Sequence, residues 1–143
     1  MNGWKISIVC GLCCLGFATL IHAAPTTTPA SAPATVQTVN ADEFERLSKL
    51  PEHPVLDVRT PAEFAAGHLP GAINLDWKAK DFAEKVAALD KSKTYMVHCA
   101  VGGRSRSACE KMIKLSFPNV YNLEGGIMAW QRAGKKVEKE DGK

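Results

Sequence analysis

The chain carries little excess charge of either sign. Its 143 residues include 18 Lys and Arg against 15 Asp and Glu, a formal net charge of +3. Residues 1–23 contain a single charged side chain, that of Lys5, so their removal would lower the net charge to +2. A charge this balanced argues against a nucleic acid or a membrane surface as the partner of this protein.

Cysteine is scarce beyond the first 23 residues, where Cys99 and Cys109 are the two that remain. Two cysteines in an exported protein would ordinarily pair. Cys109, however, is expected more than one turn into a helix that Cys99 precedes. At a rise of about 1.5 Å per residue, the two Cα atoms would lie too far apart for a disulfide. Cys109 is therefore predicted to be a core residue, with a resolving thiol as the alternative.

Residues 1–23 have the pattern of a secretory signal peptide. Lys5 precedes the uncharged and mostly apolar run 6–21, and small residues follow that run. Cleavage is expected after Ala23, with Ala24 as the alternative, and the mature protein would be periplasmic or secreted without stable membrane insertion. An uncleaved anchor is the competing interpretation, but the run is slightly shorter than the roughly 20 residues that span a bilayer. Lipidation is not expected, because no small residue precedes any cysteine of this segment, Cys10, Cys13 and Cys14.

Large apolar side chains are missing from residues 24–35, which consist mainly of Pro, Thr and Ala. Such a segment cannot bury a core and is predicted to be a semi-extended linker. Residues 135–143 alternate in charge and are predicted to form a flexible tail. The chain shows no internal repeat, so residues 36–134 are predicted to form one globular domain.

The predicted domain alternates between short apolar runs and amphipathic segments. Strands are predicted at 36–39, 55–58, 72–75, 95–98 and 118–123. Helices are predicted between them, the later ones at 82–89, 105–115 and 127–132. This alternation predicts an α/β three-layer fold, in which a mostly parallel five-stranded sheet has helices on both faces.

The helix starts carry capping signals. Asn40 with Glu43, and Thr60 with Glu63, have the spacing of capping boxes. Asp81 is predicted to cap the helix at 82–89. The first helix is expected to bury an apolar face made of Phe44, Leu47 and Leu50.

Cys99 follows a predicted buried strand and precedes a glycine-containing loop that opens a helix. Backbone N–H groups in such a loop can point inward and form an anion-binding nest. The helix N-terminus adds unpaired donors and a partial positive charge, and Arg104 adds a permanent cation. These features favour the thiolate, so Cys99 is predicted to be a nucleophile. A packing role beside a helix cap is the competing interpretation.

The length of the loop bears on which group Cys99 can hold. Four residues separate Cys99 from Arg104, whereas cysteine phosphatases of the tyrosine-phosphatase type have five at this point. The shorter loop makes a smaller cradle, which suits one extra sulfur atom better than a tetrahedral phosphoryl group. A phosphatase or arsenate reductase on the same fold is therefore the less favoured alternative.

Two other strands bring polar residues and glycines to the sheet edge at which ligands of such folds bind. The strand at 55–58 brings Asp57 and Arg59, and the strand at 118–123 is followed by Glu124, Gly125 and Gly126. Glycines at this point suit a close approach of the backbone to a neighbouring loop.

Three motifs, taken in order, resemble the signatures of the rhodanese family of sulfurtransferases. Residues 56–64, Leu-Asp-Val-Arg-Thr-Pro-Ala-Glu-Phe, and 67–74, Gly-His-Leu-Pro-Gly-Ala-Ile-Asn, are similar to the front signature of the family. Residues 125–130, Gly-Gly-Ile-Met-Ala-Trp, are similar to its closing signature. With the Cys99 loop between them, the resemblance extends over essentially all of residues 36–134. An export signal before a single domain resembles the small periplasmic rhodaneses, including the phage-shock type.

The resemblance implies a thiosulfate sulfurtransferase. Cys99 would take a sulfane sulfur from thiosulfate, or from a persulfide or polysulfide, and pass it to cyanide or a thiol. The partners would be a small sulfur-containing anion and a thiophilic acceptor, the protein would be a monomer, and no metal or organic cofactor would be needed. Backbone N–H groups of the loop would bind substrate and stabilise the persulfide, and Arg104 would attract a dianionic donor. The loop residues are Ala100, Val101, Gly102, Gly103, Arg104 and Ser105.

Residues around the loop are assigned supporting roles. Asp57 and Arg59 are expected to form a buried ion pair that positions the loop without touching substrate. Glu63 is interpreted as a capping residue and His68 as a hydrogen bonder in a turn. His98 is interpreted as structural, because its side chain should point to the strand face opposite Cys99.

Ala100 and Val101 depart from the family pattern, which often has a polar or basic side chain at these positions. Fewer charges at the mouth of the site predict weak binding of thiosulfate and a less charged natural donor, such as a persulfide or polysulfide. A non-catalytic sulfur carrier or interaction module is the remaining alternative, because a fold does not determine a function.

Overall fold

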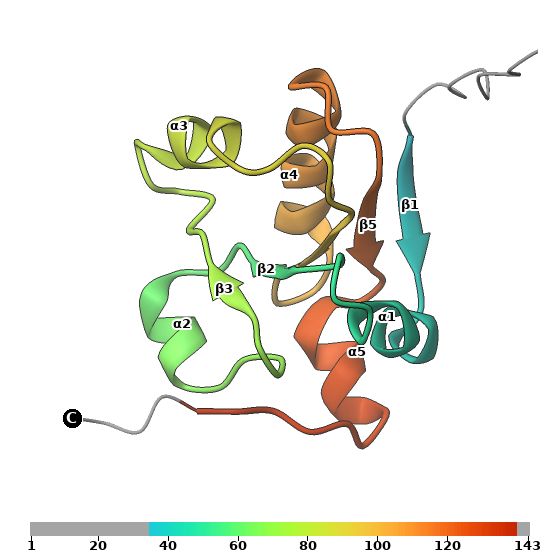
Figure 1. Cartoon of the computed structure of the whole chain (residues 1–143). Helices are drawn as coiled ribbons and strands as arrows, with labels where there is room; N and C mark the ends of the chain where they lie inside the picture. The colour runs from blue at the N-terminus through green and yellow to red at the C-terminus, as the bar shows by residue number, and fades with distance from the viewer. Residues whose placement is uncertain (1–34, 140–143) are drawn as a thin grey trace, which may run out of the picture. The chain divides into compact units, whose positions relative to one another are not determined.

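The computed structural model describes residues 35–139, which contain a single five-stranded sheet (Figure 1). The strand order is β1-β5-β4-β2-β3, and all four pairings are parallel. Parallel strands buried on both faces need helical crossovers, which explains the alternation of strands and helices in the sequence. The strands are β1 (Val36–Val39), β2 (Val55–Asp57), β3 (Ile73–Asn74), β4 (Tyr95–His98) and β5 (Val120–Leu123).

Helices cover both faces of the sheet, as the sequence predicts. One face packs against α3 (Phe82–Ala87) and α4 (Gly103–Lys114), which bury Phe82 and Met112 with Val97 of β4. The other face packs against α1 (Ala41–Ser48) and α5 (Gly126–Arg132), which bury Phe44 and Trp130 with Met96. The short helix α2 (Pro61–Ala65) follows β2 and lies at the other end of the molecule from α1 in Figure 1. The predicted α/β three-layer fold is confirmed.

The capping box predicted for α2 is complete, whereas the one predicted for α1 is only half formed. The Thr60 hydroxyl accepts from the Glu63 N–H, and the Glu63 carboxylate accepts from the Thr60 N–H, which completes the capping box of α2. At α1, the Asn40 side chain accepts from the Glu43 N–H at 3.0 Å, but the Glu43 carboxylate pairs with Arg46 instead of returning to Asn40. An arginine one turn away competes successfully for that carboxylate.

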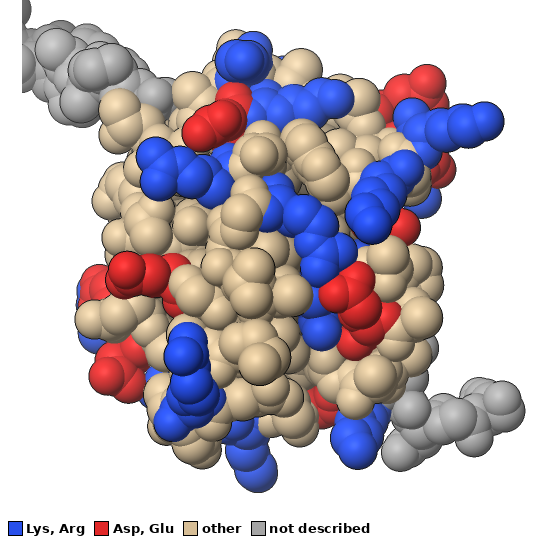
Figure 2. Space-filling view, turned by 180° about the vertical axis from the view of Figure 1, so that it is seen from behind, with Lys and Arg blue, Asp and Glu red and all other residues tan. Residues whose placement is uncertain are grey.

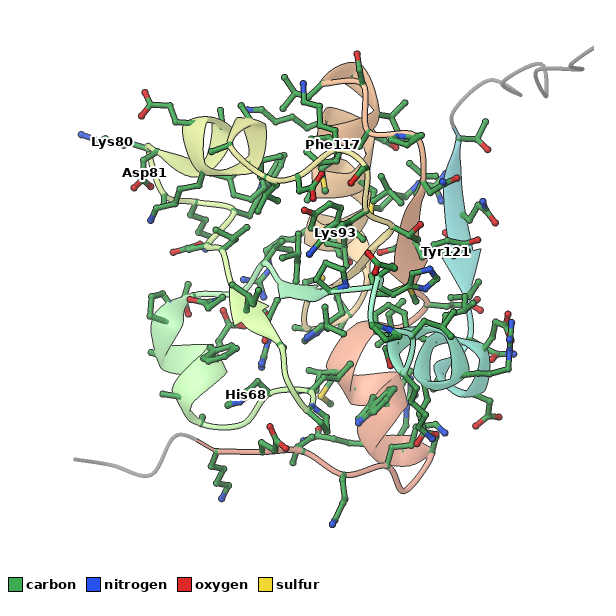
Figure 3. All side chains as sticks on the ribbon, viewed as in Figure 1. His68, Lys80, Asp81, Lys93, Phe117 and Tyr121 are labelled. Atoms are coloured by element: carbon green, nitrogen blue, oxygen red, sulfur yellow. The ribbon has the colours of Figure 1, made fainter. Side chains whose placement is uncertain are left out.

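The sequence expectations for Asp81 and for Leu50 are wrong. Asp81 makes no side-chain capping bond and pairs with Lys85, one turn further along α3, at 3.0 Å. Asp81 lies beside Lys80 at the outer edge of the molecule (Figure 3). Leu50 lies beyond the end of α1 and is 47% exposed, because the helix ends at Ser48 and the apolar periodicity no longer applies.

The C-terminal segment packs against the domain past the predicted boundary at residue 134. The Trp130 indole donates to the Lys136 carbonyl at 2.7 Å, and Lys135 pairs with Asp42 at 2.8 Å. His68 and Glu138 exchange two backbone hydrogen bonds of 2.8 Å, so residues that the sequence assigns to a flexible tail form a bridge to the turn after α2 (Figure 3). The His68 ring also stacks on Phe64 and hydrogen-bonds its carbonyl, in agreement with the turn role predicted for it.

The predicted signal peptide at 1–23, nearly all of the predicted linker and residues 140–143 lie outside the described residues. Between residues 35 and 139, no helix has the length and apolar character that a membrane span requires. Lys and Arg side chains lie interspersed with Asp and Glu side chains on the face shown in Figure 2, in keeping with the small net charge.

Candidate active site

The candidate site lies where β4 ends in the middle of the sheet. Cys99 follows the last residue of β4, and α4 begins at Gly103, two residues earlier than the sequence predicts. Gly103 and Arg104 therefore belong to the first turn of α4 and not to the loop. The loop closes this early because Gly102, the residue before the helix, adopts a left-handed conformation with φ of +97°. A Cβ at Gly102 would also lie 3.3 Å from the Gly125 nitrogen, so glycine serves both the turn and the packing.

The thiol of Cys99 is enclosed by hydrogen-bond donors. The Gly102 N–H donates to Sγ at 3.1 Å, and the Ser105 hydroxyl lies 3.4 Å from it. The residue is 1% exposed, so little of the sulfur's environment is bulk water. Backbone donors that already point at the sulfur need no reorganisation when negative charge develops on it.

These contacts favour the thiolate of Cys99 over its thiol. Burial alone would raise the pKa of Cys99. Hydrogen bonds from the Ser105 hydroxyl and from the backbone N–H groups of Ser105, Val101 and Gly102 outweigh burial and lower the pKa of Cys99 below its ordinary value. The prediction that this loop favours a nucleophilic thiolate therefore has a geometric basis.

Cys109 is the opposite case. It lies on the buried face of α4, where burial raises the pKa of its thiol to about 12. Its sulfur lies 3.9 Å from the Tyr121 carbonyl, and both Cys99 and Cys109 are free thiols. Cys109 thus has the surroundings of the predicted core residue.

The N-terminus of α5 orients the loop backbone. The Ile127 N–H donates to the Cys99 carbonyl at 2.9 Å, and the Met128 N–H donates to the Ala100 carbonyl at 3.2 Å. The unpaired donors of a helix end thereby take up the loop carbonyls. With its carbonyls turned toward α5, the loop presents its N–H groups to the sulfur. Gly125 and Gly126, where the sequence predicts a close approach of two backbones, lie at this contact between α5 and the loop.

Arg104 is paired with an acid that the sequence assigns only to helix capping. Its two terminal nitrogens donate to the two carboxylate oxygens of Glu63 at 2.9 and 2.8 Å. Arg104 lowers the pKa of Glu63 to about 2, and the carboxylate in turn raises the pKa of Arg104. The cation expected to attract an anionic donor thus already has a carboxylate partner.

Asp57 and Arg59 form the predicted buried ion pair. Arg59 Nε lies 2.9 Å from the Asp57 carboxylate, and its Nη2 donates to the Gly67 carbonyl at 2.7 Å. The Asn74 side chain donates to the carbonyls of both residues, at 3.0 and 2.8 Å. Asp57 is paired in register with His98, the residue before Cys99, which connects this network to the start of the loop.

His98 is fully buried on the sheet face opposite Cys99, as predicted. Burial lowers the pKa of its imidazole to about 4, so the ring is neutral at physiological pH. Its Nε2 lies 3.6 Å from an Asp57 oxygen and has no hydrogen-bond partner. A neutral histidine whose Nε2 has no partner suits a packing role and not proton transfer.

Asn122 is a site residue that the sequence argument does not identify. Its side-chain oxygen lies 2.6 Å from the Ser105 hydroxyl, which also lies 3.1 Å from the Gly102 carbonyl. The hydroxyl has one proton, so the Asn122 oxygen, the Gly102 carbonyl and the Cys99 sulfur compete for it. Asn122 thus affects how the Ser105 hydroxyl is oriented toward the sulfur. The available signal was a single amide side chain within the otherwise apolar and aromatic strand Val120–Leu123.

A pocket of about 270 Å³ adjoins the loop. Ala100 forms part of its wall, and Met128 of α5, which is 51% exposed, forms another. Val101, at the tip of the loop, is 69% exposed. The pocket is lined by Arg59, Glu63, Ala66, Gly67, Ala100, Ile127, Met128 and Gln131. No group of three or more His, Cys, Asp or Glu side chains within residues 35–139 is arranged to hold a metal ion.

Comparison with known proteins gives consistent matches. The family model of the rhodanese-like domain matches residues 40–133. The chain is 32% identical over 98 residues to a sulfurtransferase of Allochromatium vinosum, an alignment that spans 68% of this chain and 90% of that protein. It is 38% identical over 92 residues to the chloroplastic thiosulfate sulfurtransferase 16 of Arabidopsis thaliana, spanning 57% of this chain and 77% of that protein.

A solved structure has a similar fold. The crystal structure of a rhodanese-related protein from Thermoplasma volcanium superimposes with a TM-score of 0.65 at 35% sequence identity, covering 73% of this chain and 99% of that one.

Proposed function

The chain belongs to the family of rhodanese-like domains, and on that premise we propose that it is a sulfurtransferase that carries a sulfane sulfur as a persulfide on Cys99. One observation supports this above the others: the Cys99 sulfur lies in a cradle formed by the Gly102 N–H at 3.1 Å and the Ser105 hydroxyl at 3.4 Å. The same donors lower the pKa of Cys99.

In the first step, the Cys99 thiolate attacks the outer sulfur of thiosulfate. A bond forms between Cys99 Sγ and that sulfur, and the sulfur–sulfur bond of thiosulfate breaks. The bonding electron pair leaves with sulfite, and an anionic persulfide remains on Cys99. The loop N–H groups that stabilise the thiolate are placed to stabilise the persulfide as well.

In the second step, an acceptor attacks the outer sulfur of the persulfide. Cyanide forms a carbon–sulfur bond and leaves as thiocyanate, while the electron pair of the broken sulfur–sulfur bond restores the Cys99 thiolate. A thiol acceptor would leave as its own persulfide by the same exchange. Alternation between a free and a sulfur-loaded enzyme predicts ping-pong kinetics.

We further propose that a persulfide or polysulfide is a better donor than thiosulfate. Ala100 and Val101 place apolar side chains at the mouth, and the charge of Arg104 is compensated by Glu63. Specificity constants for thiosulfate and glutathione persulfide, measured with one acceptor, test this preference. A much higher constant for thiosulfate would contradict it.

A non-catalytic sulfur carrier is the second candidate function. It is favoured by the 1% exposure of Cys99, because a buried persulfide is protected from small nucleophiles. A carrier would accept sulfur and pass it on only to a specific partner, so it would show a single loading step and no turnover with cyanide.

The test is thiocyanate formation from thiosulfate and cyanide by the mature domain, with a Cys99→Ser variant and a Cys109→Ser variant beside it. We expect turnover in the wild type and in Cys109→Ser, and none in Cys99→Ser. Absence of turnover in all three, with a mass increase of one sulfur atom on the wild type, would support the carrier.

We also propose that the protein is exported by cleavage after Ala23 and acts as a monomer. The intact mass of the protein recovered from the periplasm or medium reports the cleavage site. Sedimentation equilibrium of that material reports the oligomeric state.

A further inference from the structure

Glu63 binds the guanidinium of Arg104, the cation in the first turn of α4 that is expected from the sequence to attract an anionic donor. We propose that Glu63 is a specificity-determining residue: by holding Arg104 through both carboxylate oxygens, it weakens the binding of dianionic sulfur donors and thereby favours donors with one charge or none. The inference rests on the proposed function, and it assigns to Glu63 a role beyond the capping of α2.

The position of the Glu63 carboxylate is determined by contacts from two parts of the chain. On one side, the Thr60 N–H and hydroxyl donate to Oε2 at 3.1 and 2.9 Å. On the other side, Arg104 donates to Oε2 and Oε1 at 2.9 and 2.8 Å. A carboxylate held from both sides cannot swing away at low cost when an anion approaches Arg104.

The charge balance at Arg104 follows from this geometry. Glu63 is ionised throughout the physiological range, because Arg104 lowers its pKa to about 2. An anion that approaches the guanidinium meets a carboxylate within 3 Å of it and must share the cation or displace Glu63. The repulsion grows with the charge of the donor, so a dianion is penalised more than a monoanion.

The adjoining pocket also favours donors other than thiosulfate. Glu63 lines one side of it, and Ala66, Ala100 and Met128 supply apolar surface. That surface can hold the organic part of a persulfide, which thiosulfate lacks. The structure thus combines a reduced attraction for dianions with a surface suited to an organic group.

The first test measures binding without turnover. Thiosulfate is titrated calorimetrically into Cys99→Ser and into Cys99→Ser with Glu63→Gln. Glutamine preserves the capping box, since its side chain also reaches the N-cap N–H, but it removes the charge. We expect the Gln variant to bind thiosulfate about two- to fivefold more tightly, the range for releasing a partly exposed ion pair. Equal or weaker binding would overturn the proposal.

Two control variants separate charge from structure. Glu43→Gln removes the same charge from an exposed Arg46 pair on α1 and should leave thiosulfate binding unchanged. Thr60→Ala keeps the Glu63 charge but removes the hydroxyl that holds Oε2 at 2.9 Å, so it should tighten thiosulfate binding less than Glu63→Gln does. If Glu63→Gln proves unstable, Glu63→Ala is compared with Thr60→Ala, because both lose the same cap. Tighter binding in Glu43→Gln would show a general charge effect and overturn the proposal.

The second test measures donor preference during turnover. The specificity constants for thiosulfate and for 2-hydroxyethyl persulfide, which carries one charge at most, are compared with cyanide as the acceptor. Glu63→Gln should raise the thiosulfate constant several-fold relative to the persulfide constant, chiefly through KM. An unchanged ratio would overturn the proposal. Absence of turnover with either donor would instead contradict the proposed function, and the binding comparison would still decide the role of Glu63.

Discussion

Gly126 lies so close to the Cys99 carbonyl that a Cβ at this position would be 2.4 Å from that oxygen. Its φ of +56° is also one that residues with a side chain rarely adopt. The neighbouring Ile127 N–H donates to the same carbonyl, so α5 and the nucleophile loop are held together through this contact. The closing motif of the sequence is therefore part of the architecture of the candidate active site.

We expect Gly126→Ala to disrupt the loop. Gly134→Ala is the matched control, because Gly134 has a similar φ of +70° but no atom within 4 Å of an added Cβ. Alanine is strained by the positive φ at both positions, so the difference between the variants reports the close contact. Gly126→Ala should be less stable than Gly134→Ala by about 1–3 kcal/mol, the usual cost of overpacking. Its kcat/KM should also be at least tenfold lower. Urea unfolding and thiocyanate assays measure the two effects. Equal stability and equal kcat/KM in the two variants would contradict a structural role for the Gly126 contact.

Ser105 should control the reactivity of Cys99. Its hydroxyl and backbone N–H help to lower the pKa of Cys99, and Ser105→Ala removes the hydroxyl contact. The pH profile of alkylation by iodoacetamide should therefore shift to higher pH, with several-fold slower alkylation on its acidic side. Ser107→Ala, at an exposed position of the same helix, should keep the wild-type profile. A profile unchanged in Ser105→Ala would refute the role of the hydroxyl.

His98 should make the protein sensitive to acid. In the unfolded chain the imidazole binds a proton as the pH falls through 6.5, but in the folded protein burial lowers its pKa to about 4. The unfolded state therefore holds more protons between these values, and stability falls as the pH is lowered from 6.5 to 4. The expected loss is on the order of 3 kcal/mol.

Urea unfolding at pH 7, 5.5 and 4.5 measures this dependence. His98→Asn should flatten it, whereas His53→Asn, in the loop before β2, should leave it intact. The same slope in His98→Asn as in the wild type would assign the acid sensitivity to other groups.

The Asp57–Arg59 pair should affect stability and activity separately. Arg59→Met leaves the fully buried Asp57 charge without its partner, which should cost about 3–5 kcal/mol. Asp57→Asn combined with Arg59→Met removes the unpaired charge and should recover much of that stability. If the pair positions the loop, kcat stays low in the double variant. Recovery of kcat together with stability would show that the pair only stabilises the fold. Arg46→Met, which breaks an exposed ion pair, should change neither the stability nor kcat.

Local sequence determined most of the fold. The apolar runs and the capping residues Asn40 and Thr60 act through neighbours in the chain, so their structures could be predicted from spacing alone. Errors occurred where a local signal had a competitor of similar strength. Asp81 pairs with Lys85 instead of capping α3, and α4 begins at Gly103 because Gly102 already provides the left-handed turn.

The sequence by itself also determined the candidate nucleophile, since Cys99, the glycine loop and the start of α4 are consecutive. Only the tertiary structure decided what surrounds it. Glu63 reaches Arg104 across 41 positions, Asn122 reaches Ser105 across 17, and Gly126 meets the carbonyl of Cys99. These contacts depend on the order and register of parallel strands joined by crossovers, and no local pattern encodes that register. A carboxylate with the spacing of a capping residue can therefore also hold the cation of the candidate active site, and only the packed sheet brings the two together.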